Sequence, residues 1–283
     1  MTDAVRPGGP APRMSRRHAA GAGSARGLLF TVLGEFVLPA GGTVWTSSII
    51  EVLGRLGVEE KAARQALMRT AADGWLVSER HGRRTRWSLT PSAERLLVDG
   101  TRRIYEFGRV AADWDGRLVL VLARVPEADR AARHLLNTRL SWAGYGTPGP
   151  GVWISTHAER IAEVEQLLRH CDVQDARIFR AEHVGGADLA GMVRQAWDLD
   201  AVEARYRQFL AEFAAARTHE PLPRLIELVH AWRRFPAIDP ALPRDLLPRR
   251  WIGERAAALF ARRHAEWGAE ASAAWLRLDA PPA

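Results

Sequence analysis

Two neighbouring side chains on one predicted helix carry functional groups that can recognise bases in duplex DNA. The guanidinium of Arg64 matches the two acceptor atoms of guanine, and the amide of Gln65 matches adenine. At 100° of rotation per residue, the helix predicted over 58–75 has a small apolar side that can pack and a polar side that can contact a partner. The polar side holds Lys61, Arg64, Gln65 and Met68, with Arg69 at its flank. A merely solvated helix face is the alternative interpretation.

The segments before this helix predict how it is held. Residues 28–38 form a mostly apolar helix, and residues 47–56 form a second one for which Thr46 can provide the N-terminal cap. A tight turn then leads into the helix over 58–75. This order is typical of a helix-turn-helix, whose second helix lies in the major groove. The side chains best placed for the phosphates are Arg69 and either Thr46 or Ser47.

The segments after the helix predict a β-hairpin and a further helix. Two alternating runs, 75–80 and 84–89, are joined through His81, Gly82 and Arg83. The residues expected on the buried face of the hairpin are Trp75, Val77, Thr85, Trp87 and Leu89. Those expected to point outward are Arg80, Arg84 and Arg86, with Arg83 at the tip, where contact with phosphates or the minor groove is expected. Thr90 and Pro91 begin the next helix, which carries Ala93, Leu96 and Leu97 inward.

Several short motifs resemble the PaaX family of bacterial transcriptional regulators. In the N-terminal part they are GGTVWT (41–46), ARQAL (63–67), GWL (74–76), LTP (89–91) and GTRRIY (100–105). Further along they are LSWAGYG (140–146), PGVWI (150–154) and the segment from LLP (246–248) to Trp251. The resemblance covers nearly everything after the first 26 residues. It implies a winged-helix repressor of an aromatic degradation pathway, typically that of phenylacetate, that an aromatic acyl-CoA releases from DNA.

The expected fold class is α+β with several domains. Residues 1–25 read as a disordered basic tail, and residues 26–108 as the winged helix-turn-helix. Residues 109–186 contain strands at 117–125, 151–155 and 176–183 alternating with helices at 127–141 and 157–169. With one strand still unplaced, this order suggests a ferredoxin-like domain, and the resemblance implies the same fold, similar to the Cas2 nucleases. Residues 187–283 read as an all-α unit for ligand binding and dimerisation, ending in a helix pair or one helix broken around Gly268.

An enzymatic function has weaker support. The alternative is a Cas2-like, metal-dependent nuclease with an accessory winged domain, but residues 119–125 contain only Arg124 as a charge where a metal-binding carboxylate is needed. Residues 144–149 match G-x-G-x-x-G after a helix and before a strand, which is the reverse of the dinucleotide-binding order, so we expect a turn. We therefore expect no catalytic residues, no metal and no cofactor.

The expected effector site lies in the middle domain. An acyl-CoA needs arginines for its phosphates and an apolar or aromatic pocket for its acyl group. Arg139, Trp142, Tyr145 and Trp153 could supply both, although packing within the domain is the alternative for each.

Composition is compatible with a cytoplasmic DNA-binding homodimer. Forty Lys and Arg residues against 33 Asp and Glu give a net charge of +7, but nearly all the cations are arginines, so the charge alone is weak support for nucleic acid. Cys171 is the single cysteine, which excludes a disulfide within the chain and suits a reducing compartment. No run of about 20 apolar residues suggests a membrane span. One winged helix reads only a short half-site, so we expect a homodimer on an inverted repeat.

Overall fold

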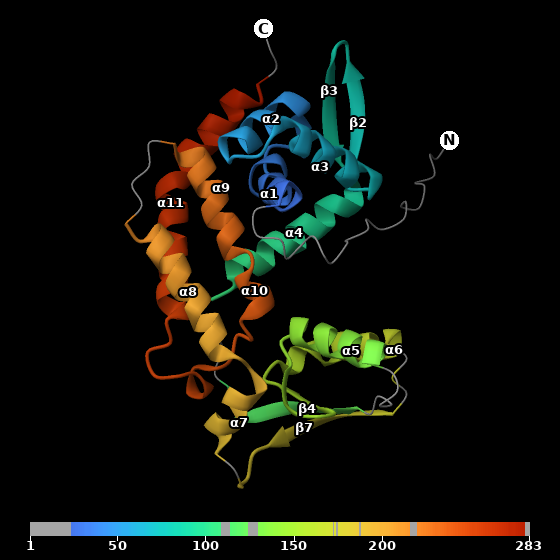
Figure 1. The fold of residues 1–283 in the computed structure, drawn as a ribbon, viewed down its shortest axis with the longest axis vertical. Coiled ribbons are helices and arrows are strands. Elements are labelled where there is room, and N and C mark those ends of the chain that lie inside the picture. The colour runs from blue at the N-terminus through green and yellow to red at the C-terminus, as the bar shows by residue number, and fades with distance from the viewer. Residues whose placement is uncertain are drawn as a thin grey trace, which may run out of the picture. The chain divides into compact units, whose positions relative to one another are not determined.

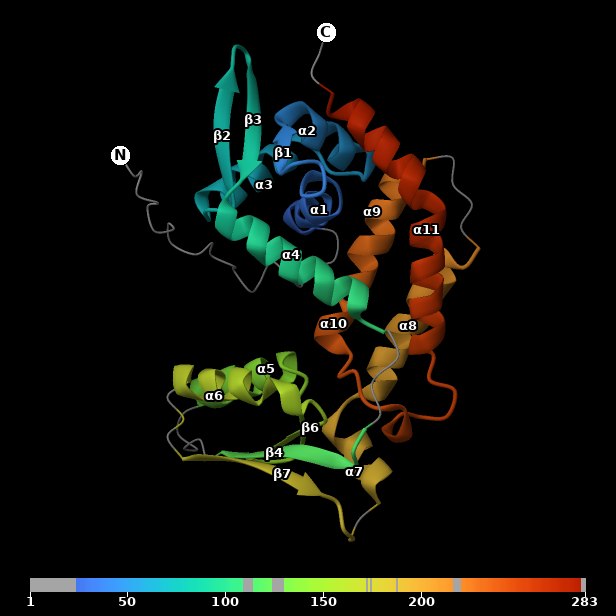
Figure 2. The same cartoon turned by 180° about the vertical axis from the view of Figure 1, so that it is seen from behind.

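The computed structural model describes residues 24–108, 114–123, 130–171, 173, 175–186, 188–215 and 220–280, with the side chains of 130–132 and 142 left out. Nearly all of the predicted tail, 1–25, lies outside the described residues. The chain divides into two compact units, which are described separately (Figures 1 and 2). Unit 1 comprises 1–106, 213–233 and 259–283, and unit 2 comprises 107–212 and 234–258. The segment 187–283, predicted as one helical domain, therefore contributes to both units.

Unit 1 is built around its first helix. Helix α1 (Ala25–Val32) begins at Ser24, whose Oγ accepts a hydrogen bond from the Gly27 N–H at 3.0 Å, and it continues as a π-helical turn, η1 (Leu33–Val37). Helices α2 (Thr46–Arg55), α3 (Glu60–Ala72) and α4 (Pro91–Glu106) follow in the predicted order. The Leu29, Val32 and Leu33 side chains are fully buried, so this apolar helix forms the centre of the unit's core.

The predicted hairpin is present as β2 (Leu76–His81) and β3 (Arg84–Leu89), joined by the two-residue turn Gly82-Arg83 with Gly82 at φ +61°. It extends away from the helices, as both views show (Figures 1 and 2). A short strand that the sequence did not predict, β1 (Thr43–Trp45), pairs with β3, so the antiparallel sheet has the order β1-β3-β2.

The register of the hairpin corrects part of the predicted face. Ser78 lies opposite Trp87, and Arg80 lies opposite Thr85. Because opposed residues share a face, Val77 lies on the other face from Trp87, where it is 58% exposed, and the prediction that Val77 is buried was wrong. Arg80 likewise lies on the opposite face from Arg84 and Arg86.

Segments from the C-terminal part complete the core of unit 1. They are α9 (Pro221–Trp232) and most of α11 (Gly253–Leu278). Trp232 stacks on Phe260 with 4.8 Å between ring centroids. Helix α11 runs unbroken through Gly268, so the expected break there was wrong. Its inner stripe holds Trp267, Ala271 and Trp275, whose burial keeps the helix continuous.

Helix α4 also differs in one respect from its prediction. Thr90 caps it as expected, with its Oγ1 accepting a hydrogen bond from the Ala93 N–H at 3.2 Å. The helix then passes through Gly100 without interruption. Leu96, predicted to point inward, is 43% exposed, while the neighbouring Leu97 is half-buried. Three consecutive apolar residues at 96–98 made the inward face ambiguous in the sequence.

Unit 2 contains the predicted ferredoxin-like arrangement. Strands β4 (Arg117–Ala123), β5 (Gly146–Gly149), β6 (Val152–Ser155) and β7 (Ala176–Glu182) form an antiparallel sheet in the order β5-β6-β4-β7. Helix α5 (Arg130–Trp142) connects β4 to β5, and η2 (Ala158–Arg160) with α6 (Ile161–His170) connects β6 to β7. This β-α-β-β-α-β order agrees with the predicted domain.

The strand that the sequence left unplaced is β5, and it lies inside the Gly-rich motif at 144–149. The expectation of a turn there holds only for its first residues. A Cβ on Gly146 would lie 2.5 Å from Cε2 of Trp197, so glycine allows this strand to pass closely against the indole ring. The segment is a strand because it pairs with β6, with Gly146 opposite Ile154, and the packing of Trp197, 51 residues away, is what requires glycine there.

Both faces of this sheet are covered. One face packs Val119, Val121 and Trp153 against α5 and α6. The other packs Ile154 and Leu120 against α7 (Leu189–Ala196), the start of α8 (Leu199–Phe213) and the loop around η3 (Arg244–Leu246). The short helix α10 (Phe235–Ile238) stacks the Phe235 ring on Tyr206 of α8, with ring centroids 4.1 Å apart.

Within the described part of the chain, no helix is both long enough and apolar enough to cross a membrane.

Candidate nucleic-acid interface

Helix α3 has the two faces that its sequence predicts. On the inner face, Ala63, Ala66 and Thr70 are fully buried and Leu67 is 1% exposed. Glu60 lies in the first turn, where its charge is favourable to the helix dipole. Gly74, at φ +80°, allows the chain to leave the helix through a hydrogen bond from the Trp75 N–H to the Thr70 carbonyl at 3.1 Å.

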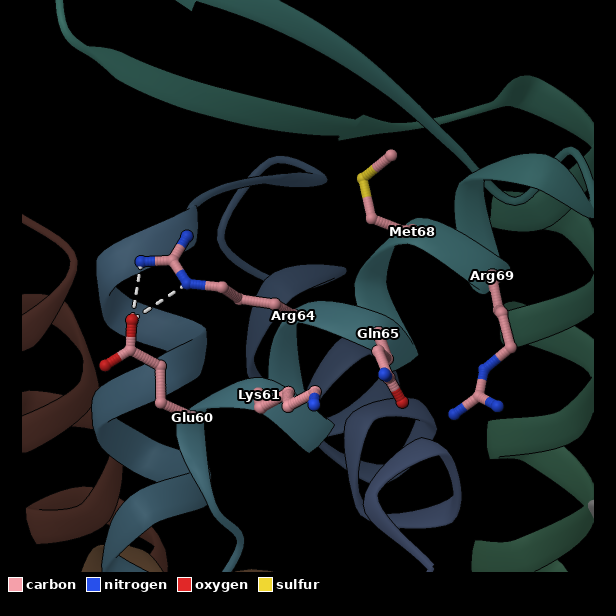
Figure 3. Close-up of a pocket in the computed structure, with 6 residues that line it drawn as sticks. All are labelled: Glu60, Lys61, Arg64, Gln65, Met68 and Arg69. Carbon is pink, nitrogen blue, oxygen red and sulfur yellow. Dashed lines mark hydrogen bonds and ion pairs between the residues drawn. The ribbon is translucent and has the colours of Figure 1, made fainter.

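The outer face of α3 forms an open hollow. It is lined by Glu60, Lys61, Arg64, Gln65, Met68 and Arg69, whose side chains fan out from the helix in Figure 3. Arg64 donates from Nε to Oε1 of Glu60 at 2.8 Å, and the side chains of the pair are 56% and 62% exposed. An ion pair this exposed contributes only a few tenths of a kcal/mol, so a base or phosphate can replace it at little cost. The predicted polar face is therefore assembled and accessible.

The C-terminal end of α3 is anchored to α1. The Arg26 guanidinium donates to the Asp73 carboxylate at 2.5 Å, and Arg26 is only 5% exposed. Its guanidinium lies 5.5 Å from the Phe30 ring centroid, and Phe30 contacts Trp75 edge-on at 4.7 Å. These contacts join both sides of the helix end to the buried first helix, which fixes the direction in which the outer face points.

The N-terminus of α2 corrects the prediction for Thr46. The cap residue is Trp45, which makes no side-chain capping bond. The Thr46 hydroxyl instead donates to the Thr85 carbonyl at 3.0 Å and accepts from the Trp87 indole N–H at 2.9 Å. It therefore joins α2 to the hairpin and is already occupied, while the neighbouring Ser47 is exposed.

The four hairpin arginines are not equivalent. Arg83 and Arg84 are exposed at the tip, and Arg80 is exposed with its Nε donating to the Gly82 carbonyl at 3.1 Å. Arg86 is half-buried, because its Nη2 donates to Thr43 Oγ1 at 2.7 Å and its guanidinium lies 5.0 Å from the Trp45 ring centroid. Arg86 thus holds β1 against β3.

Three of the four predicted effector residues, Arg139, Tyr145 and Trp153, have described side chains, and these lie in or beside the core of unit 2. Tyr145 and Trp153 are 1% and 3% exposed and belong to one hydrophobic cluster with Leu140. Burial raises the pKa of Tyr145 to about 12. Arg139 is half-buried and contacts Cys171, with 3.8 Å between Nη1 and Sγ, while Trp142 ends α5 and its side chain lies outside the described residues. Packing thus accounts for the two described aromatic side chains, and a ligand touching them would have to enter this core.

Sequence reasoning placed Met68 on the outer face but gave it no function. Met68 is 61% exposed, the largest apolar side chain in the hollow. The signal was its spacing, three and four residues after Gln65 and Arg64.

Elsewhere, the part of the chain described here brings no three His, Cys, Asp or Glu side chains together as a metal site. Strand β4, where a Cas2-like nuclease needs a carboxylate, contains none.

These features define a multidomain α+β protein with a basic, solvent-accessible helix face. Family models match along most of its length: "PaaX-like protein" over 24–93, "PaaX protein central Cas2-like domain" over 111–193 and "PaaX-like protein C-terminal domain" over 197–277. The chain is also 30% identical over 257 residues to the transcriptional repressor PaaX of Escherichia coli (strain K12), covering 83% of this chain and 78% of that one. The chain therefore belongs to the PaaX family.

A solved structure shares the fold. The chain is similar to the uncharacterized protein Rv0674 from Mycobacterium tuberculosis, with a TM-score of 0.62 and 23% identity. The match covers 89% of this chain and 98% of that one.

Proposed function

We propose that the protein is a sequence-specific, DNA-binding transcriptional repressor that acts in the cytoplasm as a homodimer. The observation that carries the proposal is α3, whose inner face is fully packed while its outer face presents cations and an amide beside an arginine-bearing hairpin. In this proposal α2 and α3 are the helix-turn-helix and β2–β3 is the wing. Membership of the PaaX family, and the relative named a transcriptional repressor, support it.

Each exposed residue takes a distinct role. Arg64 and Gln65 contact base edges, since arginine can form a bidentate hydrogen-bonded contact with guanine and glutamine can form one with adenine. The residues for phosphates are Lys61, Arg69 and Ser47, and Arg83, Arg84 and Arg80 of the wing contact phosphates or the minor groove. Thr46 and Arg86 act indirectly by holding the wing against α2 and β1, because the Thr46 hydroxyl is bonded to the hairpin and Arg86 Nη2 is bonded to Thr43.

The salt dependence of binding tests the proposal. With about four phosphate contacts per protomer, the slope of log K against log salt concentration should be near −7 for a dimer on an inverted repeat. Fluorescence anisotropy with an operator selected from genomic fragments measures it, and sedimentation of the complex gives the number of protomers. A slope near zero, binding only to single strands, or divalent-metal-dependent cleavage of the DNA by the pure protein would contradict the proposal.

Three arginine variants separate base reading from phosphate contact. Arg64→Ala should weaken operator binding by about 1 to 3 kcal/mol and relax sequence preference, whereas Arg84→Ala should weaken binding to all duplexes more evenly. Arg102→Ala is the matched control. Arg102 is an exposed arginine of α4 paired with Asp99, so its substitution removes the same charge at a site away from the proposed interface. Equal behaviour of all three variants would refute the assignment of roles.

We further propose that an aromatic acyl-CoA, of the phenylacetyl type, releases the protein from its operator. The support is the family resemblance and the half-buried Arg139, which lies on α5 beside the core that contains Tyr145 and Trp153. A tenfold loss of DNA affinity requires only about 1.4 kcal/mol of preference for the DNA-free arrangement. Calorimetry and operator release with phenylacetyl-CoA, phenylacetate and CoA test this; equal binding of CoA alone, or no release by the thioester, would remove the effector and leave DNA binding untouched.

A further inference from the structure

The outer face of α3 consists of two parallel rows of side chains. Residues four apart lie one above the other on a helix, so Glu60, Arg64 and Met68 form one row, and Lys61, Gln65 and Arg69 form the next. All six line the same hollow (Figure 3). The second row has a cation at each end, but the first row begins with a carboxylate and ends with an apolar thioether.

This difference orients the helix on a duplex. A carboxylate is repelled by phosphates, and a thioether gains nothing from them, so the row of Glu60, Arg64 and Met68 suits the floor of the major groove. In the second row, Lys61 and Arg69 at the two ends suit the phosphates beside the groove, while Gln65 between them lies next to Arg64 and can still reach a base edge. The Arg64 guanidinium lies along its own row, where it contacts the Glu60 carboxylate.

Met68 is then the apolar member of a row that faces base edges. It is 61% exposed, while the buried face of the helix is complete without it. Among the groups displayed in the major groove, the C5-methyl of thymine is the largest apolar one, and an apolar side chain is the one that matches it. Methionine is unbranched and flexible, so its terminal methyl can make a van der Waals contact with the thymine methyl.

We propose that Met68 is a specificity-determining residue that contacts the C5-methyl group of a thymine in each half-site, next to the base contacted by Arg64. The inference rests on the proposed DNA-binding function and deepens it by naming a base and an atom. Because the contact is purely apolar, it should depend on one methyl group. Burying one such carbon changes affinity by about fourfold per half-site.

Replacing thymine by deoxyuridine removes that methyl group and changes nothing else in the base pair. The full-length protein is titrated with its selected operator and with versions in which each thymine in turn, at symmetric positions, is deoxyuridine. The parent should lose about fourfold per half-site at one thymine position. Met68→Ala should bind the unmodified operator more weakly by a similar factor and lose its sensitivity at that same position, while other positions stay unchanged.

Two further variants complete the design. Met68→Leu keeps an apolar side chain and should retain part of the methyl sensitivity. Leu96→Ala truncates an exposed apolar residue of α4 and should behave as the parent does. Alanine at 68 favours the helix, so circular dichroism should show an unchanged fold.

The outcomes are distinguishable. If Met68→Ala binds operator specifically but keeps the parent's response to deoxyuridine at every position, the contact is refuted while the DNA-binding function stands. If the parent itself shows no methyl-dependent position, the contact is likewise refuted. If the parent binds no duplex specifically, both the contact and the proposed function fail.

Discussion

Arg26 and Asp73 form an ion pair whose partners differ in exposure, and this difference predicts unequal costs for removing each one. The Arg26 side chain is 6% exposed and that of Asp73 is 27% exposed. Asp73→Ala leaves a buried guanidinium without its counter-ion, which costs about 3 to 5 kcal/mol. Arg26→Met keeps most of the apolar volume and leaves a carboxylate that water can reach, so we expect about 1 to 2 kcal/mol.

The double variant gives the sharper test. With both charges removed, no unpaired ion remains, so it should be more stable than Asp73→Ala alone by about 2 kcal/mol. Urea unfolding should be monitored through hydrogen exchange of peptides from α1 and α3. This readout reports on unit 1 alone, which matters because the two compact units can unfold separately. Two results would refute this reasoning. Either Arg26→Met lowers the free energy of unfolding more than Asp73→Ala does, or the loss in the double variant equals the sum of the two single losses.

Three further predictions test the supporting structure. Burial raises the pKa of Asp239, more than the hydrogen bond from Tyr206 lowers it, so the folded state holds the proton more tightly than the unfolded state. The stability that this proton contributes is present below the ordinary pKa of 3.8 and is lost as pH rises. Urea unfolding between pH 4.5 and 8 should therefore show that the free energy of unfolding of Asp239→Asn, relative to that of the parent, increases with pH. Gly146→Ala, whose Cβ would lie 2.5 Å from Trp197, should lower the melting temperature of unit 2, whereas Gly149→Ala, with open space around it, should not. Thr90→Ala should cost about 1 kcal/mol through the lost cap of α4, and Thr90→Ser should restore most of it in the same thermal assay.

The two faces of α3 could be predicted from sequence because they depend only on local geometry. A helix repeats every 3.6 residues, so the spacing of Ala63, Ala66 and Thr70 determines which side packs, whatever surrounds it. The cap at Thr90 and the chain reversal at Gly74 are local for the same reason. The four-stranded arrangement of unit 2 was predictable in outline, since few topologies suit a β-α-β-β-α-β order.

Only the tertiary structure decided the features that depend on distant partners. A shift of one residue in the hairpin register moved Val77 from the buried face to solvent, because side chains alternate along a strand. Gly146 is part of a strand because it pairs with Ile154 of β6, and a larger residue is excluded there because Trp197 packs against it. Thr46 lost its predicted capping role to partners about 40 residues away.

The division of the chain into units shows the same limit. Tyr105 and His264 both contact the Glu35 carboxylate at the π-helical turn, with 2.7 Å between His264 Nε2 and Glu35 Oε1. These three residues come from η1, α4 and α11, and no local pattern connects them. Helical periodicity identifies which face of each segment is buried, but the partner that buries it is selected by packing complementarity over the whole chain. The sequence by itself therefore determined the character of α3, whereas tertiary packing decided what holds it in place.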